Sequence, residues 1–238
     1  MRWRLACFVA SCAAAISACS KTTSPTQSGS SAAETTAMPR SIAETGQFWE
    51  RPPSFSFLVF EGDVRKLMPA LLSTLGYRVL TQREQVSSGS ELVDQVMGLD
   101  PYTGLHGAQP SLQKAYWFAN GFTVLVDSEL LLADDAAIDT FCKENHTSMI
   151  AGTWERVSRT ANVVEVSAAG VRKASYLEDG HPNQKAPPPQ HPGLLKNPDP
   201  SGIRNELQAR GISFDQVFGR VTATVVTLEE LATDGNRR

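Results

Sequence analysis

Ser111 and Lys114 have the S-x-x-K spacing, in which a lysine one helical turn further along takes the proton of a serine nucleophile. Because serine and lysine are common, about one chance match is expected in a chain of this length. The S-D-N and K-T-G motifs that accompany such a serine are also absent. We therefore interpret the pair as part of an ordinary helix or strand, with Lys114 exposed to solvent.

Cys142 and His146 are spaced i, i+4, so on a helix they would face each other. A thiolate beside an imidazole would form a nucleophile or half of a metal site. However, Cys142 shares its helix face with Ile138 and Phe141. This pattern favours a buried, inert thiol.

The four histidines, His106, His146, His181 and His191, are spread along the chain, and neither H-E-x-x-H nor C-x-x-C occurs. We predict no metal site and no cofactor. His181 and His191 each precede a proline and flank a proline-dense stretch. We expect both to lie on the surface.

Four carboxylates, Asp127, Glu129, Asp134 and Asp135, surround a turn that we interpret as a second hairpin. Paired carboxylates can carry acid–base chemistry or bind calcium. Their spacing does not fit an EF-hand, and aspartate is common at turns and helix caps. The structural use is therefore favoured.

Two further patterns are candidates for binding another protein. The loop at residues 98–110 contains three glycines with Tyr102 and His106, and it lacks the glycine motifs of phosphate-binding loops. Trp154 and Arg156 would share one face of a strand, and both residue types are favoured at binding hot spots. With the two proline-flanking histidines, the candidate partner-binding residues are Tyr102, His106, Trp154, Arg156, His181 and His191. We predict no catalytic residue.

The elements that must position these residues are expected in residues 46–238. Strands are expected at 54–60, 77–80, on both sides of Asn120-Gly121, and at 147–157, 162–167, 171–177 and 220–228. Helices are expected from Asp63 to Leu75, with a late start or kink at Pro69, and at 90–97, 135–145 and 201–210. This order predicts a single α+β domain with a mostly antiparallel sheet of hairpins and a meander, and with helices packed on one face.

The start of the chain has the pattern of an export signal. Arg2 and Arg4 precede a short apolar run, which is too short for the about 20 residues that a membrane-spanning helix needs. The sequence Ile16-Ser17-Ala18-Cys19 then resembles the lipobox of bacterial lipoprotein precursors. An ordinary secretory signal with a chance cysteine is the alternative.

The lipoprotein resemblance implies that residues 1–18 are cleaved and that Cys19 receives a diacylglycerol, with a further acyl chain on the new amino terminus. Several acyl chains anchor a protein far more firmly than one. Ser20 implies sorting to the outer membrane where the cell has one. Residues 19–45 are rich in serine and threonine, so we expect them to form the lipidated cysteine and a flexible tether.

The composition limits the function classes. The chain has 22 basic and 25 acidic side chains and no basic stripe, which argues against nucleic acid as a partner. We expect a lipid-anchored envelope protein that binds another protein, such as an inhibitor or immunity factor against a toxin. A structural or assembly lipoprotein is the first alternative, and an envelope hydrolase is the second.

Overall fold

The computed structural model describes residues 54–97, 112–128 and 132–231, which all fall within one compact unit. The export signal, Cys19, the tether and the loop at 98–110 lie outside the described residues. No helix in the described ranges is long and apolar enough to cross a bilayer.

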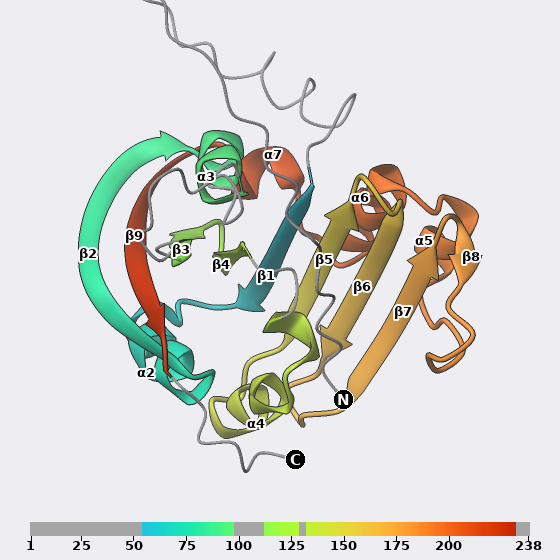
Figure 1. Ribbon diagram of the computed structural model, residues 1–238, viewed down its shortest axis with the longest axis horizontal. Coiled ribbons are helices and arrows are strands. Elements are labelled where there is room, and N and C mark those ends of the chain that lie inside the picture. Colours follow the sequence, from blue (N-terminus) through green and yellow to red (C-terminus); the bar gives the residue numbers. More distant parts are fainter. Residues whose placement is uncertain (1–53, 98–111, 129–131, 232–238) are drawn as a thin grey trace, which may run out of the picture. The chain divides into compact units, whose positions relative to one another are not determined.

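One antiparallel sheet of nine strands forms the centre of the fold, in the order β2-β9-β3-β4-β1-β5-β6-β7-β8 (Figure 1). The expected α+β class with an antiparallel sheet is confirmed. The strands are β1 Phe55–Glu61, β2 Tyr77–Ser88, β3 Leu112–Ala119, β4 Phe122–Asp127, β5 Met149–Glu155, β6 Thr160–Val166, β7 Arg172–Glu178, β8 His181–Pro182 and β9 Arg220–Glu230.

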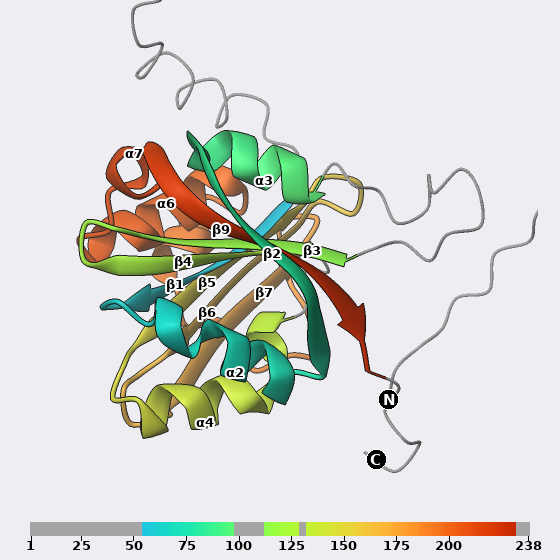
Figure 2. The ribbon, with the colours of Figure 1, turned by 90° about the vertical axis from the view of Figure 1, so that its left-hand side faces the viewer.

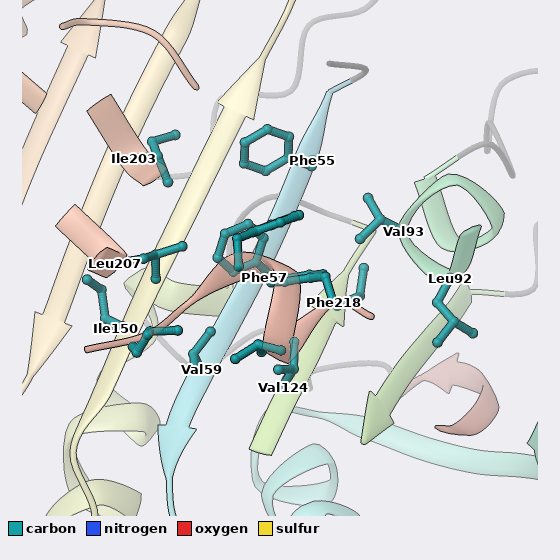
Figure 3. Close-up of a cluster of buried hydrophobic side chains, with 14 of the residues drawn as sticks. Phe55, Phe57, Val59, Leu92, Val93, Val124, Ile150, Ile203, Leu207 and Phe218 are labelled. Atoms are coloured by element: carbon teal, nitrogen blue, oxygen red, sulfur yellow. The ribbon is translucent and has the colours of Figure 1, made fainter. Parts of the chain in front are cut away.

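Strand β1 lies between β4 and β5, and its first six residues are all buried. Because side chains alternate along a strand, Phe55 and Phe57 enter one core and Leu58 and Phe60 enter the other. Figure 3 shows the first core, where Phe57 lies beside Phe218 with ring centroids 5.0 Å apart. Two separate cores therefore stabilise the sheet, one on each face.

Helices cover both faces of the sheet, so the prediction that they pack on one face is wrong. Helices α3 (Gly89–Met97), α5 (Pro192–Lys196), α6 (Pro200–Ala209) and α7 (Phe214–Val217) contribute to the core of Phe57. Helices α2 (Met68–Thr74) and α4 (Ala136–Glu144) contribute to the core of Phe60 (Figure 2). The sequence shows which side of each helix is apolar but not which face of the sheet that side will cover.

Several local predictions are confirmed. Asn120 and Gly121 have φ values of 51° and 88° and join β3 to β4, as the Asn-Gly pair predicts. Strands β5, β6 and β7 form the expected meander. Pro69 lies in the first turn of α2, after a short 3-10 helix at Arg65–Leu67, so the late start is confirmed.

Two local predictions fail. The expected second hairpin after β4 is wrong, because Leu132–Asp134 forms a 3-10 helix instead of a strand. Strand β2 continues to Ser88, well beyond the expected end at residue 80. Its extension is polar and largely exposed, so it lacks the alternation by which strands are recognised.

Candidate functional site

The structure does not bring the six candidate partner-binding residues together. Tyr102 and His106 lie outside the described residues. Trp154 is only 8% exposed and belongs to the core of Phe57. Arg156 is exposed and follows the end of β5, where its backbone N–H donates to Ser54 Oγ.

The two histidines that flank the proline-dense stretch have opposite environments. His181 is exposed on β8. His191 is 1% exposed and directly precedes α5, so the expectation that it lies on the surface is wrong. A histidine followed by proline carries no local signal that the ring will be buried by elements distant in the sequence.

Cys142 and His146 do not form a pair. Helix α4 ends at Glu144, and His146 is exposed with a φ of 50°, in the left-handed conformation that follows a helix end. Cys142 is fully buried, and burial raises the pKa of its thiol to about 12. This buried position agrees with the prediction of an inert thiol.

The acidic residues near α4 have structural contacts. Asp135 caps α4 by accepting the N–H of Ala137, and Asp134 accepts the hydroxyl of Tyr176 at 2.7 Å. Glu129 lies outside the described residues. Within the described residues, no group of three histidine, cysteine, aspartate or glutamate side chains could hold a metal ion.

Lys114 forms a buried ion pair with Asp127, so its predicted exposure is wrong; its S-x-x-K partner Ser111 lies outside the described residues. The Lys114 Nζ–Asp127 Oδ1 distance is 2.6 Å, and both side chains are 0% exposed. Asp127 Oδ2 also accepts the N–H of Leu132, and Lys114 Nζ lies 4.9 Å from the centre of the Tyr77 ring. The pair joins adjacent strands and fixes the chain after β4.

His191 belongs to a polar network between the sheet and the helices α5 and α6. Ser175 Oγ on β7 lies 2.9 Å from His191 Nδ1 and accepts the backbone N–H groups of Gln190 and His191. Ser175 is 0% exposed. Its hydroxyl is therefore engaged in positioning the chain and is shielded from any substrate.

Arg210 connects the remaining members of this network. Its guanidinium donates to Glu165 Oε2 on β6 at 2.7 Å and to Glu206 Oε2 one helical turn earlier at 2.9 Å. The Arg210 hydrogen bond is the largest cause that lowers the pKa of Glu165. Glu206 Oε1 accepts the N–H of Gly193, which ties α6 to α5. Only the i, i+4 spacing of Glu206 and Arg210 could have been found from the sequence.

The two edges of the sheet differ sharply. One edge is β8, which has two residues and ends in Pro182. The other edge is β2, which has 12 residues and, within the described part of the chain, pairs only with β9 (Figure 1). Short strands and prolines are common protections of sheet edges, and β2 has neither.

Strand β2 also presents apolar side chains to solvent. Residues 80–84 are exposed in succession, with Leu80 52% exposed, and Val86 is 59% exposed further along. Leu80 is the extra residue of a bulge, after which Thr81 to Ser88 pair with β9 without interruption. We call Thr81–Ser88 the open edge. Within the described residues, the side of this stretch that faces away from β9 pairs with no other strand, although the Ser88 N–H at its end donates to Glu91 Oε2. This side of the backbone and the exposed side chains suit an extended peptide.

Comparison of the chain with protein-family models, with curated protein sequences and with solved structures finds no match.

Proposed function

We propose that this chain is an envelope lipoprotein whose folded part binds another protein, in the manner of an inhibitor or immunity factor. The single observation that supports binding most directly is the open edge of β2. The occupant that we propose is an extended segment of the partner, which adds a tenth strand to the sheet.

The backbone of the open edge favours this occupant. In an antiparallel pair, the N–H and C=O groups on one side of a strand bond to one neighbour and those on the other side remain available. An added strand satisfies these groups, and the side chains beside it give specificity. A compact helix could not match this row of groups.

The side chains of the open edge also suit a strand. It carries Arg83 and Glu84 at its centre and Val86 near its end, so opposite charges and an apolar side chain are available for cross-strand pairs. The neighbouring helix α3 is fixed to the edge through Gln95, whose Oε1 accepts a hydrogen bond from Gln85. A partner would therefore meet a rigid strand.

The proposed anchor supplies the location. Lipid on Cys19 and a tether at residues 20–45 would hold the folded part near the membrane, where a toxin that enters the envelope would meet it. Capture of such a toxin needs binding alone. This role agrees with the sequence analysis, which predicts no catalytic residue.

Affinity capture of the mature lipoprotein from envelope extracts tests the proposal. The variant V86K places a charge on the open edge, and V171K is the matched control because Val171 is 61% exposed in the turn between β6 and β7. We expect V86K to weaken binding of the captured partner by about tenfold or more, or ~1.4 kcal/mol. V171K should bind normally.

Two results would argue against the proposal. Equal capture by V86K and V171K would exclude the open edge, provided that urea unfolding shows both variants folded. A captured partner whose expression harms no cell, with or without this lipoprotein, would favour an assembly role over an immunity role.

A further inference from the structure

The ring of His191 has an unusual setting for a titratable group. It is 1% exposed, it directly precedes α5, and its Nδ1 lies 2.9 Å from Ser175 Oγ on β7. Ser175 Oγ also accepts the N–H groups of Gln190 at 2.8 Å and His191 at 2.9 Å. One hydroxyl thus fixes both the ring and the backbone that leads into α5.

These contacts define the protonation state of the ring. A hydroxyl oxygen has two acceptor positions and one hydrogen to donate. Both acceptor positions of Ser175 Oγ are filled by backbone N–H groups, so its hydrogen is donated to Nδ1. Nδ1 is therefore the unprotonated nitrogen of a neutral ring, and the hydrogen of the ring lies on Nε2.

Charged groups from three elements face this ring. They are Glu165 on β6, Lys173 on β7, and Glu206 and Arg210 at the end of α6. Nε2 lies 3.8 Å from Glu165 Oε2, beyond hydrogen-bond distance, and that oxygen accepts from Arg210 at 2.7 Å. Burial is the largest cause that lowers the pKa of His191, and the carboxylates of Glu206 and Glu165 oppose it.

We propose that Ser175 and His191 form an acid-sensitive latch that holds Gln190 and α5 against β7. A second proton on the ring would be added at Nδ1 and would convert this nitrogen from an acceptor into a donor. Nδ1–H would then face a hydroxyl whose acceptor positions are already filled. The cation can keep its hydrogen bond only if Ser175 releases a backbone N–H.

The direction of the pH dependence follows from linkage. The pKa of His191 is lower in the folded latch than the ordinary value of 6.5, so the closed latch favours the neutral ring. The stability that this gives is complete above about pH 6.5 and is lost as the pH falls toward the folded-state pKa. The latch therefore opens on acidification and closes at neutral pH.

A second contact holds α5 to α6. The N–H of Gly193 donates to Glu206 Oε1 at 2.6 Å. A Cβ at residue 193 would lie 2.6 Å from the same oxygen, so glycine allows this approach. Acid should accordingly loosen the end of α5 near Gln190 first, while Leu194 stays in the core of Phe57.

Amide hydrogen exchange of the mature chain between pH 7.5 and 5 tests the latch. Protection factors, which are corrected for the intrinsic pH dependence of exchange, should fall at Gln190 and His191 as the pH is lowered. The fall should reach about tenfold for each unit by which the pKa of the ring is lowered. Amides of β1 serve as the internal reference and should show no such change.

The variant H191N is the matched control. An asparagine oxygen can replace Nδ1 as the acceptor for Ser175, but it does not titrate, so protection at Gln190 should become independent of pH. The same pH dependence in H191N and in the natural chain, or none in either, would overturn the proposal. Should H191N fail to fold, nitrogen NMR of the natural ring decides, because a neutral ring protonated at Nδ1 would also overturn it.

Discussion

At the scale of single residues, the buried polar groups of this protein are organised around contacts between strands and helices. Lys114 and Asp127 could have been paired from the sequence, because a two-residue turn at Asn120-Gly121 places residue 114 opposite residue 127. The contact of His191 could not, because Ser175 comes from a different strand and no pattern near either residue indicates their approach.

The ion pair of Lys114 and Asp127 should couple the stability effects of substitutions at the two residues. The variant K114M should lower the free energy of unfolding by about 3–5 kcal/mol, because it leaves the carboxylate of Asp127 buried without its cation. The double variant K114M/D127N should recover most of this loss, since the amide oxygen can still accept the N–H of Leu132. Urea unfolding measures both changes.

The single variant D127N completes the comparison. A loss in the double variant as large as the sum of the losses in K114M and in D127N would contradict this coupling of the two charges. It would show that the two charges stabilise the protein independently of each other.

At the scale of elements, the predictable parts are those with strong apolar patterns. The run from Phe55 to Phe60 identifies β1, and Asp135 followed by Ile138 and Phe141 identifies α4. The polar half of β2 lacked such a pattern, because an edge strand with one uncovered side has little apolar surface to bury. No sequence pattern therefore indicates the open edge. Its position depends on the order in which the strands of the whole sheet pair.

The close contact of α5 with α6 should make Gly202 intolerant of a larger side chain. A Cβ at Gly202 would lie 1.9 Å from the backbone oxygen of Asn197, and a backbone atom cannot move aside as a side chain can. We expect G202A to destabilise the protein by about 1–3 kcal/mol or more, although alanine favours helices. Q208A, on an exposed position of the same helix, is the control.

Thermal unfolding of the two variants provides the measurement. G202A should melt at a clearly lower temperature than Q208A, and equal melting temperatures would show that α5 and α6 can separate without cost.

At the scale of the whole molecule, two features would act together: a proposed lipid anchor at Cys19 and a sheet whose long edge strand β2 pairs, within the described residues, only with β9. The fold class could be predicted because alternating strands and capped helices indicate it locally. The placement of helices on both faces could not, because it follows from the long-range order of the strands, in which β1 lies at the centre of the sheet and β9 lies beside the edge strand β2.

The proposed lipid anchor makes membrane attachment depend on Cys19. The variant C19A should leave the membrane fraction and appear in the soluble fraction, because the acyl chains are attached through this residue in the proposed lipoprotein. Fractionation of cells followed by detection of the protein measures the change, with C142A as the control for loss of a cysteine. A C19A protein that remained in the membrane fraction would contradict the lipoprotein proposal.

Amide exchange of β2 in the bound complex tests whether a partner adds a strand to this edge of the sheet. We predict that the captured partner will strongly protect alternate amides between Thr81 and Ser88, since only every second N–H points toward an added strand. The amides of β8 should be unchanged. A partner that binds tightly while the exchange of every β2 amide stays the same would contradict strand addition at β2.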